Sequence, residues 1–176
     1  MITRQQLKLC IPNATESNID RFLQPLIDTM TKYKINTGPR MAAFLAQIQH
    51  ESGSLKYVRE IASGEAYEGR ISLGNTEPGD GKRFKGRGIL QITGRLNYKL
   101  LSISLGVDFV ANPELLEEPQ YAALSAGWFW NARKLNELAD LATEESFQQI
   151  TKKINGGLMH HNLRKANWFR CMKVLN

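Results

Sequence analysis

The sequence predicts a mainly α-helical fold with a long loop region and at most a short β-hairpin. Apolar residues recur at helical spacing in several separate segments. No segment alternates clearly between apolar and polar residues, except for a short hairpin candidate within residues 56–92. Glycine, proline and asparagine are concentrated between residues 62 and 87, which indicates turns and loop structure.

The length of 176 residues predicts a single domain that is large enough to bury a core. We divide it into an N-terminal helical segment, residues 1–35, and a main part, residues 36–176. Cys10 and Cys171 have no metal or redox spacing, and we expect no disulfide between them. No apolar stretch precedes Pro12 and none reaches membrane-spanning length, so we expect a soluble cytoplasmic chain.

The net charge of +6 and the pI of about 9.4 predict a polyanionic partner. Nucleic acid, an anionic membrane surface and an acidic cell wall polymer all fit that description. The basic residues are scattered, and a solvated face is the default interpretation of their local groups. These groups are Lys82, Arg83, Lys85, Arg87 and Lys152, Lys153, Arg164, Lys165, Arg170, Lys173.

The first strong helix spans Ile19 to Met30, with Pro25 expected to kink it or to begin a new first turn. A second helix starts after residues 37–39 (Thr-Gly-Pro) and ends near Gly53. Further helices are expected over residues 95–105, 120–133, 135–142, 144–154 and 162–175. In the helix over residues 120–133, we interpret Trp128, Phe129 and Trp130 as core residues rather than as platforms for stacking sugars.

Glu51 lies at the end of the second helix, where partial burial and the negative end of the helix dipole favour the protonated acid. Glu60 follows nine residues later, and a turn at Gly53 would bring it to face Glu51 across a cleft. Two carboxylates in different environments can cleave a glycosidic bond. Most of the 17 acids must be ordinary surface residues, which is the alternative interpretation of this pair.

His50, next to Glu51, suggests a zinc helix, but Ser54 stands where the second histidine of that motif would be. We therefore expect no metal site. In the stretch after residue 86, the buried pattern of Ile89, Leu90 and Ile92 aims the polar residues between and after them at one surface. These polar residues are Gln91 and Thr93.

Several motifs between residues 40 and 170 resemble glycoside hydrolase family 19, which includes plant-type chitinases and many phage endolysins. The motifs occur in the order that the family shows. They are residues 42–47 with His50 and Glu51, residues 83–93 with Asn97 and Tyr98, residues 106–113, residues 128–130 and residues 154–157. The resemblance implies a lysozyme-like or chitinase-like helical domain whose main part is the glycoside hydrolase core.

The resemblance also implies roles for individual residues. Glu51 would be the general acid, Glu60 the general base, and Thr93 would help to hold the attacking water. Substrate-binding positions implied in the same way are Gln91, Asn97, Tyr98 and Asn155.

One departure concerns a glutamate that plant chitinases carry two residues after the Asn-Gly-Gly motif and that pairs through an arginine with the catalytic acid. Met159 stands there, and Arg164 is the candidate to replace that support and to take part in substrate binding. The chain also lacks the disulfide-forming cysteines and the secretion signal of those chitinases, which favours the endolysin branch.

We therefore expect an endolysin that hydrolyses β-1,4 bonds of peptidoglycan by inversion, with carboxylates roughly 6.5 to 9.5 Å apart. It would need no cofactor and would have no separate wall-binding module. We expect it to bind no nucleic acid, to have no stable protein partner and to act as a monomer. Its partners would be peptidoglycan and the anionic envelope surface. A holin-type protein would release it from the cytoplasm to the wall.

Three alternatives remain open. A lytic transglycosylase uses one glutamate and no attacking water, and residues 51–52 and 88–92 also resemble that class. A chitinase would differ only in substrate. A non-catalytic basic module that binds cell wall or nucleic acid would keep its binding without Glu51 and would lose it uniformly with salt.

Overall fold

The computed structural model describes residues 1–175, which fold into nine α-helices and three short 3-10 helices without a sheet. The mainly α prediction is therefore confirmed for this part of the chain. The α-helices are α1 (Arg4–Cys10), α2 (Glu16–Lys32), α3 (Gly38–Glu51), α4 (Asp80–Arg83), α5 (Arg95–Leu105), α6 (Pro119–Ala132), α7 (Leu135–Asp140), α8 (Glu144–Asn155) and α9 (His161–Leu175). The 3-10 helices are η1 (Glu65–Tyr67), η2 (Ile71–Leu73) and η3 (Pro113–Glu117).

Polar N-cap residues explain where the main helices begin. Thr15, Thr37 and Thr143 each accept a hydrogen bond from a backbone N–H of the first turn of α2, α3 and α8. The helix α2 continues through Pro25, so the expected new first turn does not occur there.

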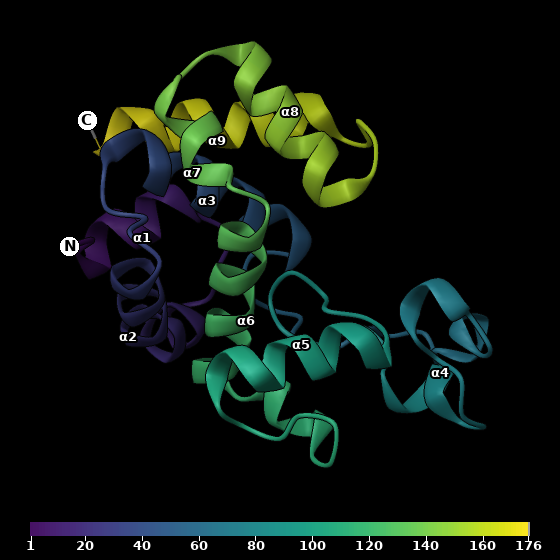
Figure 1. Ribbon diagram of the computed structural model, residues 1–176. Helices are drawn as coiled ribbons and strands as arrows, with labels where there is room; N and C mark the ends of the chain where they lie inside the picture. Colours follow the sequence, from purple (N-terminus) through teal and green to yellow (C-terminus); the bar gives the residue numbers. More distant parts are fainter. Residues whose placement is uncertain (176) are drawn as a thin grey trace.

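The core has two hydrophobic clusters. The first is built around α1, α2, α3, α6 and α9, which form the main body at the left and top of Figure 1. The second joins α5 to the loops around it and consists of Phe84, Ile92, Tyr98, Leu101, Phe109 and Leu116. Trp128 and Phe129 of α6 pack against both clusters, so this helix joins the two parts of the molecule.

The helix α3 lies inside the first cluster. Its residues from Ala42 to Gln49 are all buried, and the adjoining α9 covers it along one side (Figure 1). A helix buried on every side can hold a side chain at its end in a fixed place. Glu51 is that terminal residue.

The loop region between residues 62 and 87 contains η1, η2 and α4 and is held by buried polar contacts. The Asp80 carboxylate accepts hydrogen bonds from Arg95 Nε and Nη2 and from the backbone of Thr76 and Glu77. Asn75, fully buried, links the Tyr67 carbonyl to the Arg95 N–H. In place of a hairpin, the described residues show only isolated bridges, from Arg87 to residues 59 and 92.

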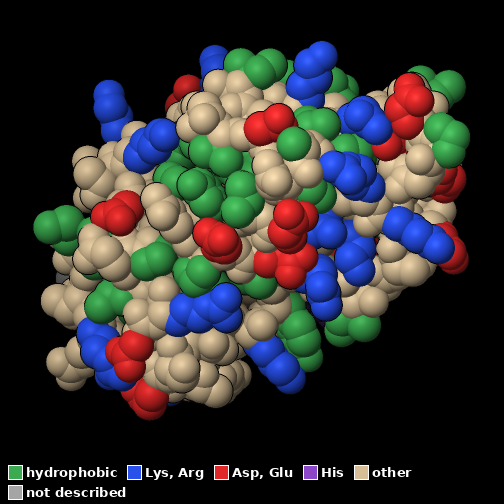
Figure 2. All heavy atoms as spheres, turned by 90° about the horizontal axis from the view of Figure 1, so that it is seen from below, with side chains coloured by type: hydrophobic (Ala, Val, Ile, Leu, Met, Phe, Trp, Pro, Cys, Tyr) green, Lys and Arg blue, Asp and Glu red, His purple; other side chains and the backbone are tan. Residues whose placement is uncertain are grey.

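The surface carries mixed charge. On the face drawn in Figure 2, Lys and Arg side chains lie among Asp and Glu side chains. Cys10 and Cys171 are both buried and free. None of the helices in residues 1–175 combines the length and the apolar character that crossing a membrane requires.

Candidate active site

Glu51 is held at the end of α3 by an ion pair with α9. Its side chain is 22% exposed, and Arg164 Nη1 lies 2.5 Å from Glu51 Oε1. The contact is an ion pair without hydrogen-bond alignment, because Glu51 Oε1 has no hydrogen-bond donor among the described residues. The sequence analysis names Arg164 as the candidate support for this acid, and the structure places its guanidinium against the Glu51 carboxylate.

A buried network holds Arg164 in turn. Its Nη1 donates to Gln47 Oε1 at 2.7 Å, and its Nε donates to the Met159 carbonyl at 3.3 Å. Gln47 Nε2 donates to Thr151 Oγ1 of α8 at 2.9 Å. Gln47 lies one helical turn before Glu51, so both side chains are on the same face of α3. These neutral groups orient the guanidinium but do not neutralise its positive charge, so Glu51 is its partner of opposite charge.

Two histidines lie beside this network. His160 Nδ1 is 3.3 Å from His50 Nε2, and the ring centroids are 5.2 Å apart. Burial and the nearby charge of Arg164 lower the pKa of His50. The pair joins α3 to the loop before α9. Within residues 1–175, no three His, Cys, Asp or Glu side chains are grouped so that they could hold a metal ion.

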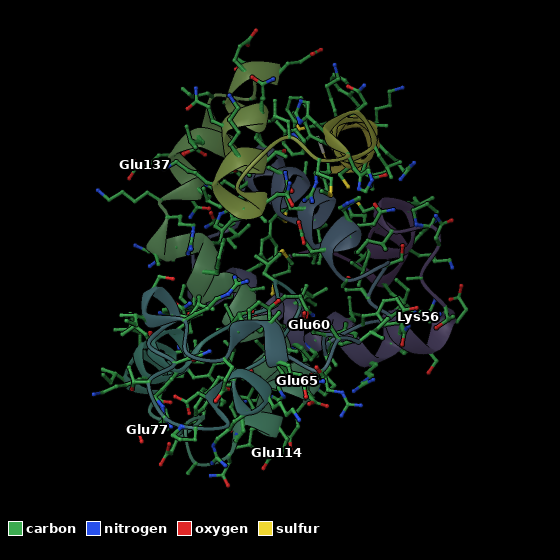
Figure 3. The ribbon with its side chains drawn as sticks, turned by 90° about the vertical axis from the view of Figure 1, so that its right-hand side faces the viewer. Lys56, Glu60, Glu65, Glu77, Glu114 and Glu137 are labelled. Atoms are coloured by element: carbon green, nitrogen blue, oxygen red, sulfur yellow. The ribbon has the colours of Figure 1, made fainter. Side chains whose placement is uncertain are left out.

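Glu60 is held by near neighbours in the loop region. Tyr67 Oη donates to Glu60 Oε1 at 2.8 Å, and the Gly86 N–H donates to Glu60 Oε2 at 3.0 Å. Burial, together with the Glu60 carboxylate, raises the pKa of Tyr67. In Figure 3 the labelled Glu60 lies near the centre of the molecule, between the helical body above and the loop region below.

Gly86 joins Glu60 to Gln91. A Cβ at this glycine would lie 2.7 Å from Gln91 Oε1 and 3.2 Å from Glu60 Oε2, so both side chains meet over its backbone. Gln91 itself has a positive φ of 51°, a conformation that is strained for a non-glycine residue and is often found at functional sites. The structure therefore brings the second carboxylate together with a predicted substrate-binding residue.

Gln91, Thr93 and Asn97 line one cavity of about 130 Å³. Thr93 Oγ1 donates to the Gln91 carbonyl at 2.9 Å, and Asn97 Nδ2 donates to the Thr93 carbonyl at 2.7 Å. Trp128 and Phe129 form another wall of this cavity. The core interpretation is right for Trp130, which is fully buried, but Trp128 and Phe129 are only half-buried.

Two predicted substrate-binding residues are inside the protein. Tyr98 is fully buried, its hydroxyl donates to the Lys85 carbonyl at 2.7 Å, and burial raises its pKa to about 12. It anchors the loop and cannot touch a sugar. Arg164 is 2% exposed and is likewise a positioning residue for Glu51 rather than a substrate contact. The side chain of Asn155, half-buried at the end of α8, makes no hydrogen bond with the described residues.

Sequence reasoning missed Gln47, Tyr67 and the pair Asp80–Arg95. Gln47 had a usable signal, because a polar residue one turn before a candidate acid in a buried helix requires a partner. Tyr67 and Asp80 lie in a stretch without periodicity, where no local pattern distinguishes them from exposed loop residues.

The sequence model of the family described as chitinase class I, glycoside hydrolase family 19, matches residues 28–143. That span is well over half of the chain. The chain belongs to glycoside hydrolase family 19. It is 40% identical over 118 residues to an endochitinase of Arabidopsis thaliana, covering 66% of this chain and 39% of that protein. A family 19 domain-containing protein of Haemophilus influenzae is 31% identical over 150 residues, which cover 68% and 72% of the two chains.

The chain thus spans about two fifths of the length of the Arabidopsis relative. Among solved structures, a bacterial family 19 chitinase matches with a TM-score of 0.80 and 25% identity, over 99% of this chain and 95% of that one. Chitinase C from Streptomyces griseus gives the same TM-score at 23% identity, over 99% and 76%. These matches also take in most of the N-terminal segment, residues 1–35, for which the sequence motifs gave no counterpart.

Proposed function

We propose that the protein hydrolyses β-1,4 glycosidic bonds of bacterial peptidoglycan by inversion. Glu51 donates a proton to the leaving oxygen, while Glu60, assisted by Thr93, activates a water that attacks the anomeric carbon from the opposite face. Arg164 positions Glu51, and Tyr67 with the Gly86 N–H positions Glu60.

The observation that carries this proposal is the ordered second carboxylate. Both oxygens of Glu60 accept a hydrogen bond, and its side chain meets Gln91 over Gly86. A transglycosylase requires no such group, so this arrangement favours hydrolysis. The interspersed charge in Figure 2 gives no support on that face for a binding module with one dense basic surface.

Peptidoglycan is favoured as the substrate by the net charge of +6, because a basic protein is attracted to an anionic envelope. A chitinase is the second candidate, since the Arabidopsis relatives are named endochitinases. Chitin is uncharged, and the same two carboxylates would serve for its hydrolysis.

The test compares wild type, Glu51→Gln and Glu60→Gln on purified peptidoglycan and on a chitin hexamer, with mass spectrometry of the fragments. Each substitution should lower the rate by at least ~10²-fold, the usual contribution of general acid–base catalysis. Glu137→Gln is the matched control, because Glu137 is exposed and unpaired among the described residues (Figure 3). Products with 1,6-anhydro ends that persist in Glu60→Gln would contradict hydrolysis, and cleavage of chitin alone would establish the chitinase.

The biological role that we propose is that of an endolysin. It would act on the cell wall after a holin-type protein has released it from the cytoplasm. Production of the protein in bacteria should then cause lysis only when such a membrane protein is produced with it. Lysis without that partner, measured as loss of culture turbidity, would contradict the proposed route.

A further inference from the structure

Arg133 directly follows α6 and is stacked on an aromatic ring. Its Cζ lies 3.4 Å from the centroid of the Phe129 ring, which is close enough for direct contact between the guanidinium and the ring face. A stacked guanidinium has lost much of its rotational freedom, so less entropy remains to be lost when its N–H groups bind a ligand.

Arg133 also borders the cavity that holds the predicted sugar-binding side chains. It lines the same space of about 130 Å³ as Gln91, Thr93 and Asn97. Gln91 in turn meets Glu60 over Gly86. A glycan placed against Glu60 and Gln91 would therefore bring its neighbouring substituents to this cavity. The space suits a small group such as a carboxylate rather than a further sugar ring.

The charge of Arg133 has no partner within the described part of the chain. Four other arginines are each paired with a carboxylate, whereas the half-buried Arg170 donates to Asn167. The four pairs are Arg40 with Asp140, Arg87 with Glu117, Arg95 with Asp80 and Arg164 with Glu51. The Arg133 side chain makes neither a hydrogen bond nor an ion pair with the described residues, while its backbone N–H donates to the Asn131 carbonyl. Its outer edge is exposed, while burial of its inner side lowers its pKa. Guanidinium nevertheless stays charged in proteins.

We propose that Arg133 binds a carboxylate of the glycan substrate and thereby selects peptide-bearing peptidoglycan over chitin. A planar guanidinium matches a carboxylate with two parallel hydrogen bonds. The peptides of peptidoglycan carry carboxylates, whereas chitin has none. This assignment rests on the proposed glycosidase function, and it adds the residue that distinguishes the two candidate substrates.

The experiment measures binding, so that it does not depend on turnover. Glu51→Gln protein, with and without Arg133→Gln, is titrated in a calorimeter with soluble peptidoglycan oligomers that keep their peptides. The same oligomers after amidation of their carboxylates form the second ligand, and a chitin hexamer forms the third. Amidation should weaken binding to Glu51→Gln by about 10-fold or more, as expected for loss of hydrogen bonds to a charged group.

Arg133→Gln should weaken binding of the carboxylated oligomers by a similar factor and leave the amidated oligomers and the chitin hexamer unchanged. Lys134→Gln is the matched control, since it removes a neighbouring positive charge that does not line this cavity. Arg133→Lys should restore only part of the affinity, because lysine lacks the planar fork.

The inference is overturned if Arg133→Gln weakens all three ligands equally, if Lys134→Gln has the same effect, or if carboxylated oligomers do not bind to Glu51→Gln at all. Failure of the proposed function is seen separately, as the absence of new reducing ends when wild type is incubated with peptidoglycan. Carboxylate-dependent binding would persist in that case, so the two failures have different signatures.

Discussion

The two candidate catalytic carboxylates are held in opposite ways. Glu51 ends a buried helix and is paired with Arg164, which comes from the other end of the chain. Glu60 lies in a loop and is held by Tyr67, which is near it in sequence, and by Gly86 at the other end of the same loop region. The position of Glu51 therefore depends on the packing of the whole helical body, whereas that of Glu60 depends on the order of one loop region.

This difference predicts how substitutions near each carboxylate should affect stability and activity. Changes around Glu51 should lower both global stability and activity, because its partners α3, α8 and α9 share the first hydrophobic cluster. Changes around Glu60 should act through local opening of the loop, which requires less free energy than global unfolding. The following substitutions test that contrast.

The largest effect is expected for Arg164→Met, which removes the charge next to Glu51 and leaves Gln47 Oε1 without its donor. Breaking a buried ion pair typically costs about 3 kcal/mol or more. Urea denaturation should show that loss, and activity should fall by at least ~10-fold, since a misplaced acid loses much of its catalytic effect. Arg164→Lys keeps the charge and should recover part of both. Unchanged stability in Arg164→Met would contradict the claim that the support of Glu51 is part of the global packing.

The loop side is tested by Asp80→Asn together with pH. Arg95 holds the pKa of Asp80 below its ordinary value of 3.8. A lowered pKa in the folded state means that the stabilisation is present above that value and is lost as the pH falls through the folded pKa. We expect the protection of the amides in residues 62–87 against exchange, corrected for the intrinsic pH dependence of the rate, to fall below about pH 4 in wild type. Asp80→Asn should show that lower protection, and therefore faster exchange, already at pH 7, with a loss of about 2 kcal/mol in local stability.

A uniform increase of exchange over all helices in Asp80→Asn would contradict a local role for the loop. Asp140 provides the internal reference, because Arg40 lowers its pKa in the same way but outside the loop region. Asp140→Asn should leave exchange in residues 62–87 unchanged at pH 7.

The smallest effect is expected for Tyr67→Phe, which removes one of the two hydrogen bonds to Glu60. One such bond contributes about 1 kcal/mol, so kcat should fall by up to ~10-fold. The midpoint of thermal unfolding should hardly move. Tyr57→Phe is the control, because the Tyr57 hydroxyl makes no hydrogen bond with the described residues. A large fall in the unfolding midpoint for Tyr67→Phe would show that the loop supports global stability after all.

Much of the fold follows from local signals. The helical spacing of apolar residues predicts a helix over residues 95–105, and α5 has these bounds. The predicted start of α3, after residues 37–39, lies two residues later than the observed start at Gly38, where Thr37 is the N-cap. These features depend on neighbours in sequence, and such signals can be read directly from the chain.

The supporting contacts of the site were less accessible. The ion pair of Arg164 with Glu51 and the bond of Asn75 to Arg95 join residues whose spacing in sequence carries no information on their distance in space. Tyr98 lay in a motif whose resemblance implied sugar contact, but its ring belongs to the second hydrophobic cluster. The burial of Tyr98 results from the packing of α5 against the loops, which a local motif does not reveal.

The most direct test of the account is the anomeric form of the first product. Proton NMR on a peptidoglycan glycan or a chitin hexamer, recorded within the first minutes of hydrolysis, separates α from β reducing ends. Two carboxylates with a water between them predict inversion, so the β-linked substrate should give the α anomer first. Initial formation of the β anomer, or of a 1,6-anhydro end, would contradict the roles assigned to Glu51 and Glu60.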